Sequence, residues 1–149
     1  MKILVLCGPS GSGKTSSLKM LIDELKKEGV EVESRSDIES KHGDGDVRVV
    51  LTWGGRRVGI CTGGDSKPII ANNFKFLRDN ECDIGISGLR HNNRFWAFLF
   101  ELINCCRESE IPRFVWKLKN DEIKPKKWES NDVDRVAVGQ LKLMLQGGL

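Results

Sequence analysis

Apolar residues recur along the chain with two different spacings, and the spacing separates strands from helices. Short apolar runs and strict alternation are typical of strands, whereas recurrence every three to four residues is typical of helices. Strands are predicted at 3–6, 30–33, 47–53, 56–61, 82–87 and 113–118. Helices are predicted before Gly29, from about Pro68 to Asn80, at 95–103, and from about Asp132 to Gly147.

The alternation of these elements predicts an α/β fold, a three-layer α/β/α sandwich around a mostly parallel sheet. Gly54-Gly55 joins two strand-like runs, and such a two-residue connection predicts one inserted β-hairpin. We expect the second hairpin strand to lie beside the first strand of the chain. No internal repeat or domain linker is visible, so residues 1–149 are expected to form a single domain.

Composition is that of an ordinary soluble globular protein, with 39% hydrophobic and 30% charged residues. The net charge of +3 is too small to indicate a nucleic-acid partner. No signal peptide and no membrane-spanning apolar run is visible. The five cysteines include no C-x-x-C pair, so we expect buried thiols, Cys7, Cys61 and Cys82 among them, in a reducing cytoplasm.

The clearest functional motif of the chain follows directly after the first predicted strand. The segment Gly8-Pro9-Ser10-Gly11-Ser12-Gly13-Lys14-Thr15 satisfies the pattern G-x-x-x-x-G-K-[ST] at every fixed position. The alternative is a Gly/Ser-rich turn followed by a chance Lys-Thr pair. The position between a strand and an amphipathic helix favours a phosphate-binding loop.

This pattern suits a triphosphate for physical reasons. A helix N-terminus presents unpaired N–H groups and the positive end of a dipole, and glycines let the backbone curl around an anion. Lys14 is expected to reach the β- and γ-phosphates, and Thr15 to offer its hydroxyl to Mg²⁺. The expected nucleotide-binding residues are Gly8, Pro9, Ser10, Gly11, Ser12, Gly13, Lys14, Thr15 and Ser16.

From Ile3 to about Glu28 the chain resembles the P-loop NTPase superfamily. The string GPSGSGKTS is similar to the loop of guanylate kinases and other nucleotide kinases, and to that of some SIMIBI-type proteins. The resemblance covers under a fifth of the chain and identifies no single family. It implies that Gly8–Thr15 hold the phosphates and Mg²⁺ of a bound nucleotide, ATP or another nucleoside triphosphate.

Two better-known families are disfavoured by departures from their motifs. Small GTPases carry D-x-x-G after the hairpin, but Pro68 stands where the glycine should be. Their guanine-binding N-K-x-D is also absent, since the chain reads Lys119-Asn120-Asp121-Glu122 after the last predicted strand. Guanylate kinases grip their base with tyrosines, and this chain contains none.

Carboxylates that follow strands are candidates for holding Mg²⁺ or its water shell. Asp65 follows the second hairpin strand in a Gly-rich turn, where ligands of α/β proteins bind. Its alternative role is the cap of the next helix. Asp37, in a predicted loop at 34–46, stands where several nucleotide kinases carry a catalytic base or Mg²⁺ partner. A turn or cap role is the alternative for Asp37.

Arg90 and Arg94 lie in a predicted basic loop at 88–94, again after a strand. Either can neutralise charge on a transferring phosphoryl group, as an arginine finger does. The alternative is a solvated loop that starts the next helix.

Two functions fit these features. The first is an enzyme that binds ATP with Mg²⁺ and hydrolyses it or passes its phosphate to a small molecule. Lys14, Asp65, Arg90, Arg94 and Asp37 would be its catalytic residues. The second is a nucleotide-sensing accessory factor whose loops at 34–46 and 88–94 move on ligand binding and engage a protein partner.

Overall fold

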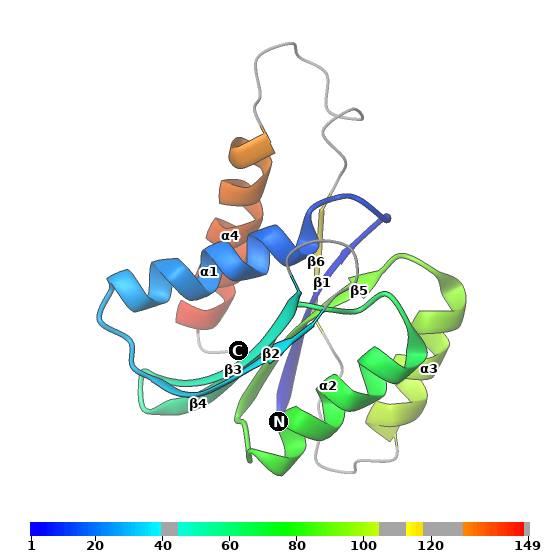
Figure 1. Ribbon diagram of the computed structural model, residues 1–149, viewed down its shortest axis with the longest axis horizontal. Coiled ribbons are helices and arrows are strands. Elements are labelled where there is room, and N and C mark those ends of the chain that lie inside the picture. The colour runs from blue at the N-terminus through cyan, green and yellow to red at the C-terminus, as the bar shows by residue number, and fades with distance from the viewer. Residues whose placement is uncertain (40–44, 105–112, 118–129, 148–149) are drawn as a thin grey trace.

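The computed structural model describes residues 1–39, 45–104, 113–117 and 130–147, and these form one sheet with helices on both faces (Figure 1). The strands are β1 (Lys2–Gly8), β2 (Val32–Ile38), β3 (Asp46–Trp53), β4 (Arg56–Cys61), β5 (Ile84–Arg90) and β6 (Arg113–Trp116). The helices are α1 (Lys14–Lys27), α2 (Lys67–Asp79), α3 (Asn93–Asn104) and α4 (Ser130–Gln146). The strand order in the sheet is β2-β3-β4-β5-β1-β6.

The three-layer α/β/α sandwich is confirmed. Helices α1 and α4 pack together on one face of the sheet, and α2 and α3 cover the other (Figure 1). Strand β1 contributes side chains to the hydrophobic cores on both faces of the sheet, because its side chains alternate between the faces. Leu4 and Leu6 join the core beneath α1 and α4, whereas Ile3 and Val5 join the core beneath α2 and α3.

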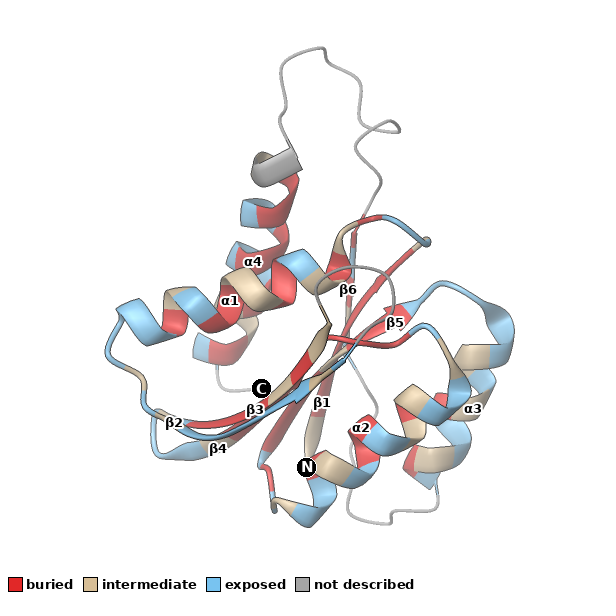
Figure 2. Ribbon diagram, in the orientation of Figure 1, coloured by how far each residue is buried: buried red, intermediate tan, exposed pale blue. Residues whose placement is uncertain are grey.

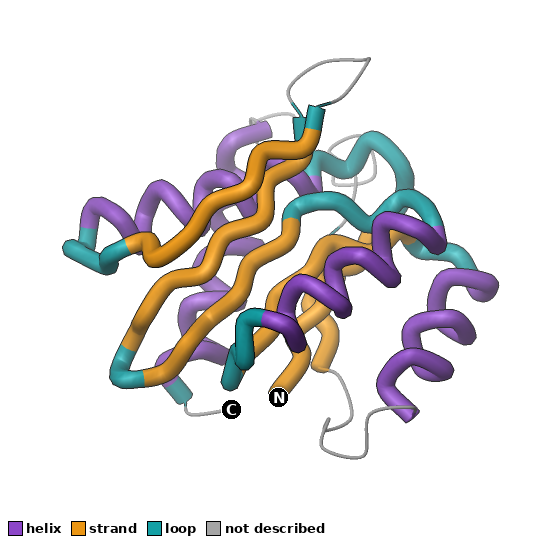
Figure 3. Tube along the Cα trace, turned by 60° about the horizontal axis from the view of Figure 1, so that its bottom comes forward, coloured by secondary structure: helices purple, strands orange, loops and turns teal. Residues whose placement is uncertain are grey.

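The inserted hairpin is confirmed as well. Strands β3 and β4 pair antiparallel around Gly54 and Gly55, whose φ angles are 58° and 73° (Figure 3). The expected neighbour of β4 was wrong. Strand β4 pairs with β5, and β5 separates it from β1.

Strand β1 lies between two parallel neighbours, β5 and β6. The register pairs Gly8 with Arg90 on one side, and Cys7 with Trp116 on the other. The carboxyl ends of the three strands therefore meet where β1 runs into the glycine-rich segment, which is where α/β sheets place their ligands.

Two expected loops are shorter than the polar sequence indicates. Residues 34–38 belong to β2, and residues 88–90 belong to β5. Strand β2 is an edge strand whose residues from Glu33 to Asp37 are exposed (Figure 2), so its pairing with β3 does not depend on apolar side chains. Charged exposed residues of this kind are typical of protected sheet edges. Residues 40–44 of the expected loop lie outside the described residues.

Helix α3 covers the sheet less completely than its apolar sequence indicates. Only Leu99 and Ile103 are buried in it, and Phe100 is 39% exposed. None of the described helices is long and apolar enough to cross a membrane.

The cysteines that the structure describes are buried free thiols, as expected. Burial raises the pKa of Cys7 and Cys82 to about 11, and that of Cys61 to about 12. Cys105 and Cys106 lie outside the described residues.

We expect Cys7, Cys61 and Cys82 to resist alkylation in the native protein near pH 8, because thiols with raised pKa values stay protonated and only the thiolate is a nucleophile. Iodoacetamide labelling, read peptide by peptide by mass spectrometry, checks this. Denatured protein is the control and should be labelled at all three. Rapid native labelling of Cys61 would contradict the packing described for β4.

Candidate phosphate-binding site

The glycine-rich loop spans the gap between the last residue of β1, Gly8, and the first residue of α1, Lys14. Gly11 and Gly13 have φ angles of 72° and 75°, in the left-handed region that favours glycine. Gly13 is the N-cap of α1, and no side chain caps the helix. The first N–H groups of α1 therefore remain available to an anion, along with the positive end of its dipole.

Gly8 is required by close packing. A Cβ atom at this position would lie 2.5 Å from the backbone oxygen of Lys117 and 2.7 Å from Oγ of Ser12. The backbone nitrogen of Lys117 also donates to the Cys7 oxygen, at 2.7 Å. The residue after β6 thus packs directly against the start of the loop.

The ammonium group of Lys14 lies across the loop. Its Nζ donates to the backbone oxygens of Gly8 and Pro9, at 3.2 and 2.8 Å. Burial lowers the pKa of Lys14, while the nearby Asp65 carboxylate opposes that shift. An anion bound here would meet a cation that is already largely desolvated, which strengthens their attraction.

Ser12 carries an unsatisfied polar group inside the loop. The residue is 7% exposed, and its Oγ has no hydrogen-bond partner among the described residues. A buried hydroxyl without a partner costs about 1–3 kcal/mol, so native structures rarely leave one. A phosphate oxygen in the loop would supply the missing partner.

A carboxylate that the sequence interpretation missed lies next to Thr15. Thr15 Oγ1 donates to Oδ1 of Asp46 at 3.3 Å, and Thr62 Oγ1 donates to the same oxygen at 3.1 Å. Thr62 Oγ1 in turn accepts from the backbone nitrogen of Val47 at 2.8 Å. Asp46 begins β3, which runs antiparallel to β4, so the hairpin brings it to the carboxyl end of β4.

The available sequence signal for Asp46 was a carboxylate just before a strand that must run antiparallel. Asp46 was not among the predicted site residues, because carboxylates were expected to follow strands and Asp46 begins one. Thr15 and Asp46 can serve as two oxygen ligands for Mg²⁺, which usually binds one or two carboxylates together with substrate phosphates. No group of three His, Cys, Asp or Glu side chains in the described part of the chain forms a metal site by itself.

Asp65 is exposed in the turn between β4 and α2, within electrostatic range of Lys14. Its alternative role as the helix cap is wrong: Ser66 is the N-cap of α2, and its side chain accepts from the Ile69 nitrogen at 3.4 Å. Pro68 lies in the first turn of α2, where proline is well accommodated.

Of the two candidate arginines, Arg90 adjoins the start of the loop and Arg94 belongs to α3. Arg90 ends β5 opposite Gly8, and its charge helps to lower the pKa of Lys14. Arg94 is exposed in the first turn of α3, where its backbone nitrogen donates to Oδ1 of Asn92 at 2.9 Å.

Asp37 lies within β2, so the expected turn or cap role is wrong. Its carboxylate accepts from Arg35 at 2.8 Å, and this exposed hydrogen bond lowers the pKa of Asp37. The structure brings Asp46 to Thr15, while Asp37 is paired with Arg35.

A buried polar network behind the loop was also missed. Lys117 follows β6, and its Nζ donates to the Gly13 oxygen at 2.8 Å, to Ser17 Oγ at 2.6 Å, and to Oδ1 of Asp134. Ser17 Oγ donates to the same Asp134 oxygen at 2.7 Å. The network joins β6, α1 and α4 at the carbonyl of the residue that precedes Lys14.

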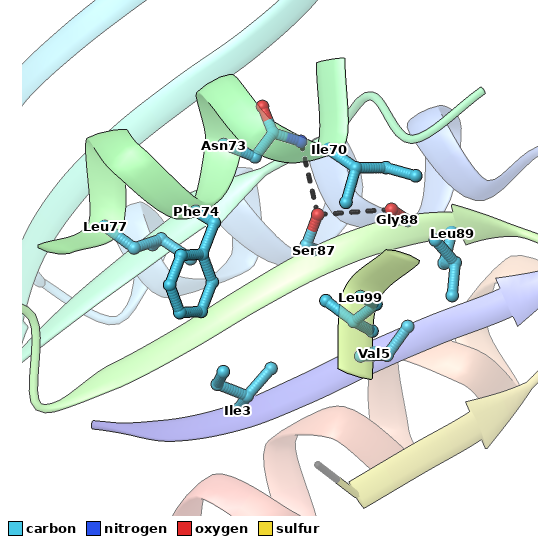
Figure 4. Close-up of a pocket in the computed structure, with 10 residues that line it drawn as sticks. All are labelled: Ile3, Val5, Ile70, Asn73, Phe74, Leu77, Ser87, Gly88, Leu89 and Leu99. Carbon is cyan, nitrogen blue, oxygen red and sulfur yellow. Dashed lines mark hydrogen bonds between the residues drawn. The ribbon is translucent and has the colours of Figure 1, made fainter. Parts of the chain in front are cut away.

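A second side-chain network supports the turn that carries Asp65. Asn73 of α2 donates to the Gly63 oxygen at 2.8 Å. It also donates to Ser87 Oγ at 3.2 Å, a contact drawn in Figure 4. The adjoining cavity, drawn in Figure 4, has a volume of about 20 Å³ and is lined mainly by apolar side chains. It has room for about one water molecule. It is therefore no candidate for a nucleotide site.

No protein-family model and no curated protein sequence matches the chain. A solved structure described as a MobB protein homolog from Bacillus stearothermophilus aligns over 99% of this chain and 99% of its own, with 13% sequence identity and a TM-score of 0.37. A likeness at this TM-score carries no argument about function. The case for a function therefore rests on the site itself.

We expect Asp134→Ala to lower the free energy of unfolding by about 3–5 kcal/mol, because it leaves the buried Lys117 ammonium without its counter-charge. Urea denaturation measures the loss. The double variant Lys117→Met with Asp134→Leu removes both charges and should recover much of it. Unchanged stability of Asp134→Ala would show that the ion pair is not formed.

Proposed function

We propose that this protein binds a nucleoside triphosphate together with Mg²⁺ at the loop from Gly8 to Ser16. The observation that carries the proposal is the uncapped start of α1 beside the desolvated Lys14 and the unsatisfied hydroxyl of Ser12. Backbone N–H groups, an ammonium and a hydroxyl are the donors that a polyphosphate requires. An ordinary Gly/Ser-rich turn leaves its polar side chains in water, because burying a lysine and a serine costs free energy.

Thr15 and Asp46 would hold the Mg²⁺ that accompanies the triphosphate, through their side-chain oxygens. Thr15 follows the lysine of the loop directly, and its hydroxyl already contacts the Asp46 carboxylate. Asp65 remains a candidate for orienting the metal's water shell, because it lies within electrostatic range of Lys14.

The reaction that this arrangement supports is attack on the γ-phosphorus by the oxygen of water or of a small-molecule hydroxyl. The bond between the γ-phosphorus and the β–γ bridging oxygen breaks, and the nucleoside diphosphate leaves. When bound, Mg²⁺ would neutralise charge on the phosphate oxygens. Lys14 and Arg90 would stabilise the charge that develops on the transferring group. Asp65, an exposed carboxylate within electrostatic range of Lys14, would accept the proton of the attacking water or hydroxyl.

The sensing alternative is a nucleotide-binding accessory factor without turnover. It depended on movable loops at 34–46 and 88–94, and strands β2 and β5 extend into both. Phosphate release from Mg²⁺–ATP, alone and with candidate acceptors, separates the two functions. Binding without release would favour the accessory factor.

We expect Lys14→Ala to weaken triphosphate binding by about 2 kcal/mol, roughly 30-fold, since it removes a charge-assisted hydrogen bond to phosphate. Equilibrium titration with ATP and Mg²⁺ measures this, with circular dichroism to verify the fold. Lys26→Ala, exposed near the opposite end of the same helix, is the matched control and should bind normally. Equal affinity in Lys14→Ala and wild type would remove Lys14 from the site.

The metal ligand is tested by comparing two carboxylates. We expect Asp46→Asn to abolish the gain in ATP affinity that Mg²⁺ provides, and Asp65→Asn to retain it while lowering any turnover. Titrations with and without Mg²⁺ measure the gain for each variant. The reverse pattern, with Mg²⁺ dependence lost only in Asp65→Asn, would assign the metal to Asp65.

A further inference from the structure

Four aromatic side chains gather beside the phosphate-binding loop, on the α3 side of the sheet. The ring centroids of His91 and Trp116 lie 5.2 Å apart, edge to face. Trp116 stacks on Trp96 at 5.6 Å, and Trp96 contacts Phe114 at 4.4 Å. None of these residues takes part in the phosphate or metal chemistry described above.

This aromatic cluster spans the end of β1. His91 follows β5 and Trp116 ends β6, the two strands that flank β1. Strands that lie two apart in a sheet are separated by about 10 Å, so rings only 5.2 Å apart must lean toward each other across β1. The backbone nitrogen of His91 also donates to the backbone oxygen of Gly8, at 2.9 Å. The cluster therefore adjoins the first residue of the loop.

The aromatic cluster is partly exposed to solvent, and one of its hydrogen-bond donors has no partner among the described residues. Trp116 is 55% exposed, although Trp96 stacks against it. The Nε1 of Trp96 is buried and has no acceptor among the described residues. An exposed indole over a buried, unpaired N–H donor favours a ligand that has both an aromatic face and hydrogen-bond acceptors.

We propose that a planar heteroaromatic ring, of the nucleobase type, stacks on Trp116 beside the loop. This proposal rests on the proposed function, because the loop would hold the phosphates next to the ring. The ring has two possible sources: the base of the triphosphate itself, or a separate nucleoside-like acceptor of the γ-phosphate. Nucleobases combine a π-face with ring nitrogens and carbonyl oxygens, and stacking on tryptophan tolerates any base.

The test separates the phosphates from the ring. Wild type, Trp116→Leu and Trp116→Phe are titrated, with Mg²⁺ present, with inorganic tripolyphosphate and with the four common nucleoside triphosphates. Nucleosides alone are then titrated into protein saturated with tripolyphosphate. Lys26→Ala, the exposed α1 control used for the loop, is also the control for general effects of surface substitution.

If the ring belongs to the triphosphate, at least one nucleotide should bind roughly tenfold more tightly than tripolyphosphate. Trp116→Leu should erase that difference, and Trp116→Phe should keep most of it. If the ring belongs to an acceptor, a nucleoside should bind the tripolyphosphate-loaded wild type and not Trp116→Leu. In both cases tripolyphosphate alone should bind Trp116→Leu and the Lys26→Ala control as it binds wild type.

Two results would overturn the proposal. If tripolyphosphate binds but no ring-containing probe gains affinity from Trp116, the ring site is wrong and the phosphate site stands. If tripolyphosphate does not bind wild type at all, the proposed function fails and the ring site fails with it.

Discussion

The position of the glycine-rich loop depends on one buried ammonium group. Lys117 lies behind the loop and holds the carbonyl oxygen of Gly13, the last residue before Lys14. Its charge is balanced by Asp134 from α4, and Ser17 of α1 completes the network. A buried ion pair of this kind contributes little net stability compared with an apolar replacement, but breaking it is costly. Its structural effect is to fix where the first turn of α1 begins.

The rest of the site follows from the position of β1 in the sheet. Strand β5 delivers Arg90 and His91 to one side of Gly8, and β6 delivers Trp116 and Lys117 to the other. The hairpin adds Asp46 from further along the sheet, at the hydroxyl of Thr15. Cations, carboxylates and aromatic rings thus surround one loop although they are far apart in the sequence. A ligand with a polyphosphate and a ring matches that combination of chemistry.

The layered fold, the hairpin and the loop could be predicted from sequence because each has a local signal. Apolar spacing marks β1 and α1, Gly54-Gly55 marks the turn, and the glycine-lysine pattern marks the loop. The length of β2 could not be predicted, because the pairing of an edge strand is made by its backbone and not by its polar side chains. The predicted position of β4 in the sheet was also wrong, because strand order depends on long-range packing.

The candidate site was predictable only in part, for the same reason. Lys14 and Thr15 belong to one local motif and could be named from it. Asp46, by contrast, comes into contact with Thr15 across 31 positions, and Lys117 reaches Gly13 across 104. Neither residue stands in a sequence pattern that distinguishes it from the lysines and aspartates of the surface. Tertiary pairing of the hairpin and of β6 with β1 gives them their roles.

The most direct measurement is a ¹H–¹⁵N NMR titration with Mg²⁺ and a non-hydrolysable ATP analogue. The largest shifts should fall on the backbone amides from Gly11 to Ser16, since these N–H groups would donate to the phosphates. Saturable shifts confined to another part of the chain, with the loop amides unmoved, would contradict phosphate binding at this loop.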